Sequence, residues 1–168
     1  MKIQSAGILL YKYVNGDLHV MLVHPGGPFW AKKDDGAWSI PKGLIDENEE
    51  PVEAAKREFK EETGVDVTGE LNELGAIKQP SGKLIFIWAV EQDLDVVKIV
   101  SNTFTLEWPK ISGHFKEYPE IDRGAWFTIK TARVKILKGQ AGFIDKLVKK
   151  LNFIPADIES NSSSLPEK

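Results

Sequence analysis

The sequence predicts an α/β protein, a sandwich in which helices cover a mixed, partly antiparallel sheet. Strand-like segments outnumber helical ones, short turns join two pairs of strands, and two segments show helical apolar periodicity. Of the 168 residues, 42% are hydrophobic, enough for one domain to bury a core. We expect one domain over residues 1–153 and a disordered tail over 154–168, which contains two prolines and four serines.

Turn residues and periodicity place the elements along the chain. The Asn-Gly pair at 15–16 suits a type I′ hairpin turn, and Pro-Ser-Gly at 80–82 suits a second turn. Pro51 is favourable at the first position of a helix, and Gly64 is a natural C-terminal cap. In order, we expect an antiparallel strand pair at 3–14 and 18–24, a loop at 25–37, a short strand at 38–40, a helix at 51–64, a hairpin at 71–79 and 83–91, strands at 96–100 and 103–108, a polar loop at 109–123, a short strand at 125–127, a helical turn at 131–137 and a last amphipathic helix at 140–151.

The composition excludes several classes of function. A net charge of −3 argues against a protein that coats nucleic acid, although a local basic pocket remains compatible with it. Without cysteine there is no disulfide framework, thiolate nucleophile or cysteine-based metal site. The longest early apolar run, 6–11, is too short for a signal peptide or a membrane span. We therefore expect a cytoplasmic protein that acts on a small molecule, with neither a nucleic-acid polymer nor a membrane as partner.

The segment 49–62 holds six glutamates against three basic residues. On a helix, these residues predict an apolar stripe and an acidic flank beside it. The stripe consists of Val52, Ala55 and Phe59, and the flank consists of Glu58, Glu61 and Glu62. Like charges three or four residues apart destabilise a helix, which a cation among them would offset. An all-oxygen ligand set suits Mg²⁺ or Mn²⁺ rather than zinc. From periodicity alone, a solvated acidic face explains the cluster equally well.

The spacing around these glutamates resembles the Nudix box over residues 43–65. Its fixed positions are filled by Gly43, Glu49, Arg57-Glu58-Phe59, Glu61-Glu62 and Gly64-Val65. The resemblance implies a Nudix-like α/β/α sandwich. It also implies a pyrophosphohydrolase that cleaves nucleoside diphosphates linked to another moiety, with Mg²⁺ or Mn²⁺ as cofactor. The metal ligands implied are Glu58, Glu61 and Glu62, with the carbonyl of Gly43 completing the site.

The resemblance implies further catalytic roles. Arg57 would orient a catalytic carboxylate, together with Glu49. A divalent metal would reverse the repulsion between the glutamates and an anionic substrate and would lower the pKa of a bound water. Glu58 is then the simplest general base. Glu120, in the loop expected at 109–123, is a second candidate, with an ordinary loop acid as the alternative.

Residues 38–43, Trp-Ser-Ile-Pro-Lys-Gly, resemble the segment that precedes the box in diadenosine tetraphosphate hydrolases and diphosphoinositol polyphosphate phosphohydrolases. The resemblance suggests that Lys42 binds phosphate as a point charge, whereas a surface lysine in a turn is the alternative. A tyrosine usual in the diadenosine tetraphosphate hydrolases is missing, since Ser-Gly-Lys occupies 81–83. This departure weakens the substrate assignment.

The loop at 25–37 supplies candidate substrate contacts. Trp30 could stack on a base and Lys33 could meet a phosphate chain, unless the loop simply packs against the body. His24 has no partner spacing that indicates a metal site. The preferred function is hydrolysis of a dinucleoside polyphosphate such as diadenosine tetraphosphate, by a monomer or homodimer. The alternatives are a hydrolase of modified nucleoside triphosphates and a module that senses a nucleotide without turnover.

Overall fold

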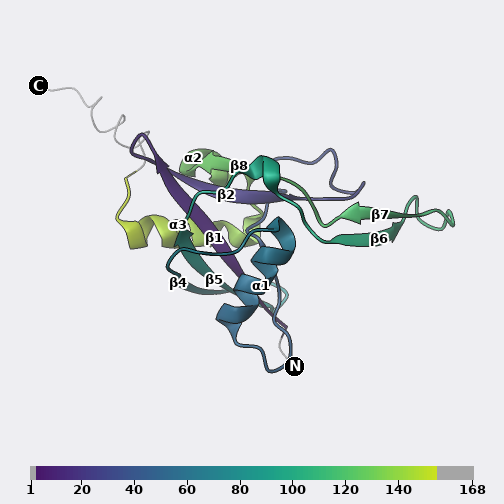
Figure 1. Cartoon of the computed structure of the whole chain (residues 1–168), viewed down its shortest axis with the longest axis horizontal. Coiled ribbons are helices and arrows are strands. Elements are labelled where there is room, and N and C mark those ends of the chain that lie inside the picture. The colour runs from purple at the N-terminus through teal and green to yellow at the C-terminus, as the bar shows by residue number, and fades with distance from the viewer. Residues whose placement is uncertain (1–2, 155–168) are drawn as a thin grey trace, which may run out of the picture.

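The computed structural model describes residues 3–154 and shows a six-stranded sheet between two helical layers (Figure 1). The elements are β1 (Gln4–Val14), β2 (Asp17–Pro25), β3 (Lys42–Leu44), α1 (Pro51–Thr63), β4 (Asn72–Lys78), β5 (Leu84–Glu91), η1 (Val96–Lys98), β6 (Thr103–Glu107), β7 (Phe115–Pro119), β8 (Ile121–Thr128), α2 (Ile129–Lys135), η2 (Lys138–Gln140) and α3 (Ala141–Leu151). The sheet runs β4-β5-β1-β2-β8, with β3 also paired to β1. Among the strands of residues 3–154, β1 and β5 pair in parallel and the other pairs are antiparallel, so the predicted mixed sheet is confirmed.

The turn and cap residues behave as predicted. Asn15 and Gly16 both have positive φ, 52° and 82°, as a type I′ turn between β1 and β2 requires. Helix α1 begins at Pro51 and ends before Gly64, whose φ of 78° forms a left-handed cap. The hairpin around 80–82 is also present, as β4 and β5. These elements depend on local chemistry, which is why the sequence alone places them.

Several predictions for the middle of the chain are wrong. Residues 96–98 form a 3₁₀ turn rather than a strand, because the Asp95 side chain accepts a hydrogen bond from the Val97 amide. Residues 38 and 39 form two isolated bridges instead of a strand, and the strand begins at Lys42. The loop expected at 109–123 contains β7, and β8 already begins at Ile121. Most of the β7 residues are exposed, so the strand lacks the apolar alternation that would have revealed it.

Each face of the sheet carries its own core. On one face, α1 packs Ala54, Ala55 and Phe59 against the sheet. On the other, α3 buries Phe143, Ile144 and Leu147, and α2 packs beside it. The apolar stripe predicted for α1 is therefore wrong in one member, because Val52 is only partly buried and Ala54 takes its place. Helix α1 packs on the sheet next to β3, and this contact positions the acidic flank of the helix.

The β6–β7 hairpin forms a separate two-stranded sheet that projects from the body (Figure 1). The tail predicted at 154–168 lies outside the described residues, apart from Ile154. Within residues 3–154, no helix combines the length and the apolarity needed to cross a bilayer.

Candidate active site

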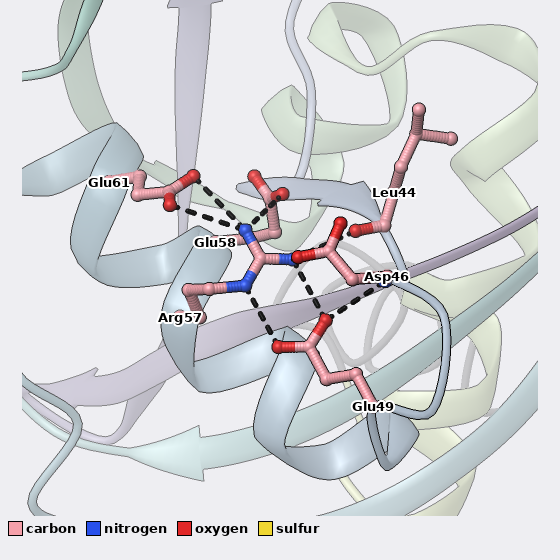
Figure 2. A network of polar contacts seen from close by, with 6 residues as sticks. All are labelled: Leu44, Asp46, Glu49, Arg57, Glu58 and Glu61. Atoms are coloured by element: carbon pink, nitrogen blue, oxygen red, sulfur yellow. Dashed lines mark hydrogen bonds and ion pairs between the residues drawn. The ribbon is translucent and has the colours of Figure 1, made fainter.

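Arg57 is the centre of a polar network on α1 (Figure 2). Its Nε and Nη2 donate to the two carboxylate oxygens of Glu49, at 2.8 and 3.0 Å. Its Nη1 donates to Glu58 at 2.9 Å and to Glu61 at 3.2 Å, and Nη2 also donates to the Leu44 carbonyl at 2.9 Å. A bidentate pair of this kind holds both side chains in one orientation. One guanidinium therefore orients three glutamates and ties α1 to the chain after β3.

Arg57 and Glu49 each keep the other in its charged form. The hydrogen bonds from Arg57 lower the pKa of Glu49 to about 2, assisted by a hydrogen bond from the Asp46 amide. The pKa of Arg57 rises further above its usual range, chiefly because of Glu49. Glu49 therefore stays a carboxylate at any physiological pH. It is placed to hold the Arg57 guanidinium and not to exchange a proton.

Glu58 lies against the backbone of β3 at Gly43. A Cβ at position 43 would overlap the Glu58 carboxylate, so a side chain at this position would displace that carboxylate. The Glu58 side chain is 13% exposed, and burial raises its pKa while Arg57 opposes the rise. Figure 2 shows this carboxylate reaching the guanidinium from the same helix. The Gly43 backbone and the Glu58 carboxylate thus lie close together.

Glu62 and Lys42 face one another across α1 and β3. Burial raises the pKa of Glu62 to about 8, against the attraction of Lys42. Burial and the nearby Lys83 lower the pKa of Lys42, against the attraction of Glu62 and Glu58. The charge of Glu120 contributes to the raised pKa of both glutamates, which places its carboxylate near them although it is far away in sequence. The fold therefore brings one basic side chain and three acidic ones into the same partly buried region: Lys42, Glu58, Glu62 and Glu120.

The oxygen donors of the cluster match the ligand type that Mg²⁺ and Mn²⁺ prefer. Across residues 3–154, no three histidine, cysteine, aspartate or glutamate side chains are arranged as a ready-made ligand set. Glu61 in particular is held by Arg57. The chemistry nevertheless fits a hard cation, because the Glu58 carboxylate lies at the Gly43 backbone and the partly buried Glu62 carboxylate has a strongly raised pKa. Ligation by all three glutamates would require Glu61 to turn away from Arg57.

The loop after β2 carries the two predicted substrate contacts. Lys33 lies over the aromatic rings of this loop, with Nζ 3.6 Å from the ring centroid of Phe29 and 5.1 Å from that of Trp30. The two rings meet edge to face at 5.1 Å. Lys33 thus makes cation–π contacts within its own loop, so in this structure its ammonium group is not free to bind phosphate.

An aromatic pocket of about 350 Å³ opens beside this loop. Its lining consists of residues 25–27, Phe29, Trp30, Phe104, Leu106 and Glu120. The sequence predicted Trp30 and Glu120 as site residues but not that they share one pocket. Phe104 and Leu106, on β6, were missed, because nothing in their local sequence indicates that a projecting hairpin faces the loop.

His24 is a further residue without an assigned role from the sequence. It is fully buried, its Nδ1 lies 3.0 and 3.1 Å from the two carboxylate oxygens of Asp122, and its Nε2 donates to the Lys33 carbonyl at 2.6 Å. The ring therefore links the loop after β2 to β8. No sequence signal marks this contact, since its partners are 9 and 98 positions away.

Comparisons with known proteins identify the family and the fold. The NUDIX domain model matches residues 2–148. A stretch of 66 residues is 64% identical to an RNA pyrophosphohydrolase of Bartonella henselae, covering 37% of this chain and 35% of that protein. A shorter stretch of 31 residues is 61% identical to Nudix hydrolase 10 of Arabidopsis thaliana, covering 18% of this chain and 11% of the relative. The chain thus matches only about a third or less of the length of these curated relatives.

Solved structures share the fold over nearly the whole chain. An Ap4A hydrolase of C. elegans in a binary complex matches with a TM-score of 0.59 and 19% identity, covering 89% of this chain and 98% of that one. The NUDIX domain of Shewanella oneidensis NrtR, complexed with ADP ribose, matches with a TM-score of 0.62 and 16% identity, covering 90% and 89%. Together with the domain match over residues 2–148, the shared fold shows that this chain belongs to the NUDIX family.

Proposed function

We propose that the protein hydrolyses a pyrophosphate bond in a nucleoside diphosphate linked to another moiety. The observation that carries this proposal is the Arg57 network, which holds Glu49, Glu58 and Glu61 together beside the partly buried Glu62. Three of these four carboxylates share one guanidinium, so the cluster keeps an excess of negative charge, and a pyrophosphate adds more, which a divalent cation would offset. The family membership supports the same chemistry.

The cluster would bind the metal, the phosphates and the attacking water through different residues. Glu58, Glu61, Glu62 and the Gly43 carbonyl would hold Mg²⁺ or Mn²⁺, which when bound neutralises phosphate charge and makes bound water more acidic. Lys42 contributes a further positive charge for a phosphate oxygen. The oxygen of water forms a bond to phosphorus, the bridging P–O bond breaks, and the proton from water passes to a carboxylate.

Two carboxylates are candidates for that proton. Glu58 has a pKa raised by burial, which makes it a better proton acceptor than an exposed glutamate near neutral pH. Glu120 faces the same cluster from the turn before β8, as a loop base would. Glutamine at each position separates the roles. Loss of the acidic limb of the pH–rate profile, on which the rate rises as the base loses its proton, in only one variant identifies the base.

For the substrate, we propose a dinucleoside polyphosphate such as diadenosine tetraphosphate. The support is the segment 38–43 and the fold shared with an Ap4A hydrolase. The chain has a second candidate function, nucleotide sensing, which is favoured by the hold of Arg57 on Glu61 and by the solved NUDIX domain complexed with ADP ribose.

A turnover panel tests these proposals. It contains diadenosine tetraphosphate, nucleoside triphosphates, ADP-ribose and a 5′-triphosphorylated RNA, each with Mg²⁺ or Mn²⁺ and each with wild type and Glu62→Gln. We expect fastest turnover of diadenosine tetraphosphate and its loss in the variant. Faster turnover of the triphosphates or of RNA would overturn the substrate proposal. Tight nucleotide binding without turnover would support sensing. Gel filtration with light scattering tests the expected monomer or homodimer.

A further inference from the structure

Backbone hydrogen bonds join the segments that line the aromatic pocket. The Gly26 amide donates to the Glu120 carbonyl, and the Glu120 amide donates to the Asn102 carbonyl, both at 2.8 Å. These two bonds place the loop after β2, the turn before β8 and the start of β6 side by side. The pocket is therefore part of the fold, although the loop after β2 is about 75 to 95 residues away in sequence from the other residues that line it.

Two glycines let the walls approach closely. A Cβ at Gly26 would overlap the Pro119 carbonyl oxygen, so the loop and β7 are in backbone contact there. At Gly27, which has a φ of 93°, a Cβ would lie only 3.1 Å from the Phe104 ring. The loop thus packs directly on the hairpin wall, and the remaining space lies between Trp30 and the β6 side chains.

The other end of the loop is fixed by His24. This buried ring joins the Lys33 carbonyl to Asp122, and it packs edge to face on Trp38 at 5.2 Å. The aromatic pair Phe29 and Trp30 therefore lies on a loop anchored on both sides, by Gly26 and by Lys33. A wall that is held in this way loses little conformational entropy when a ligand binds.

We propose that this aromatic pocket is the subsite for the nucleobase of the substrate, and that Phe104 and Leu106 of β6 form one of its binding walls. The inference rests on the proposed function, because Glu120 both lines the pocket and acts electrostatically on Glu58 and Glu62. A base in the pocket therefore leaves the phosphates at the glutamates. The volume, about 350 Å³, lies within the range of small-molecule sites, and aromatic walls offer stacking to any base.

The hairpin supplies matched variants. Phe104→Ala removes the ring from the pocket wall. Leu106→Trp fills the pocket without removing a side chain, so it remains informative if the alanine variant folds poorly. Phe115→Ala is the control, since Phe115 is on the same hairpin, is 67% exposed, pairs with Glu107 and does not line the pocket.

The first measurement is independent of catalysis. Binding of ADP and GDP in EDTA is followed by calorimetry or NMR, with pyrophosphate as the ligand that lacks a base. We expect nucleotide Kd to rise about 10- to 100-fold in Phe104→Ala and Leu106→Trp, the factor equivalent to losing one stacking contact. Phe115→Ala should keep wild-type affinity. Equal nucleotide affinity in all three variants would overturn the subsite.

The second measurement is the KM for the best nucleotide of the panel, together with the Ki of tripolyphosphate as a competitor. The two pocket variants should raise KM about 10- to 100-fold and leave Ki unchanged. An equal rise in Ki would place the hairpin at the phosphates and overturn the inference. If wild type turns over no substrate, the proposed function fails, whereas the binding experiment in EDTA still decides the subsite.

Discussion

Replacing Glu62 with glutamine is expected to stabilise the metal-free protein at alkaline pH and to leave it unchanged at acidic pH. Burial raises the pKa of Glu62 from its ordinary 4.5 to about 8 in the folded protein. Between these values, the folded protein holds a proton that the unfolded chain has released. The free energy of unfolding therefore falls as pH rises through this range. Glutamine carries no charge and is free of this loss.

The size of the effect follows from the change in proton affinity. At about 1.4 kcal/mol for each tenfold change, a rise from 4.5 to about 8 sets a ceiling of about 5 kcal/mol. The side chain keeps some contact with solvent, and the variant also loses the attraction of Lys42. We therefore expect a gain of about 2–3 kcal/mol at pH 9, of which a few tenths come from relieved repulsion with Glu58.

Urea unfolding in EDTA at pH 5 and pH 9 measures this gain. The control is Glu53→Gln on the solvated face of α1, where the side chain is 61% exposed. At pH 5, only half a unit above the ordinary pKa of 4.5, the three proteins should agree to within about 1 kcal/mol, and only Glu62→Gln should show the larger gain at pH 9. A loss at pH 9, or an equal gain in Glu53→Gln, would refute the argument. In activity assays, Glu62→Gln should lose on the order of 10²-fold in kcat, and Mg²⁺ should raise its melting temperature less than that of wild type.

Three further substitutions test the surroundings of the cluster. Arg57→Lys keeps the charge but not the bidentate hold on Glu49, so kcat should fall about 10- to 100-fold in steady-state assays, and an unchanged kcat would contradict its positioning role. Lys42→Ala should raise KM by the equivalent of about 1.5–3 kcal/mol, whereas a collapse of kcat at constant KM would make it a transition-state residue. His24→Ala leaves the Asp122 carboxylate without its buried partner and should cost about 2–3 kcal/mol in urea unfolding, and no loss would show that the link is not stabilising.

The part of the fold that could be predicted depends on local chemistry. Asn15 and Gly16 adopt the positive φ that their turn requires, and Pro51 and Gly64 bound α1 as a helix start and cap. The predictions failed at two kinds of segment: a strand whose residues are mostly exposed to solvent, and an apolar segment that a side-chain cap turns into a helical turn. β7 is mostly exposed on a projecting hairpin, and the capping carboxylate of Asp95 turns an apolar segment into a 3₁₀ turn.

In the candidate site, too, some contacts follow from local spacing and others depend on tertiary packing. Glu61 follows Arg57 by four residues on α1, so helical spacing alone predicts that these two side chains meet. The reach of Arg57 to the Leu44 carbonyl, by contrast, depends on how β3 packs against α1. The difference between Glu49, whose pKa falls to about 2, and Glu62, whose pKa rises to about 8, also depends on that packing.

By itself, the sequence determined the α/β class, the helix that carries the glutamates and the chemistry that those glutamates suggest. Only the tertiary structure decided that Trp30, Phe104 and Glu120 share one pocket, and that His24 anchors its loop. The physical reason is the range of the interactions. Helix periodicity and turn conformation are encoded in a few neighbouring residues, whereas the pocket depends on backbone hydrogen bonds and packing between segments that meet only after the sheet has formed.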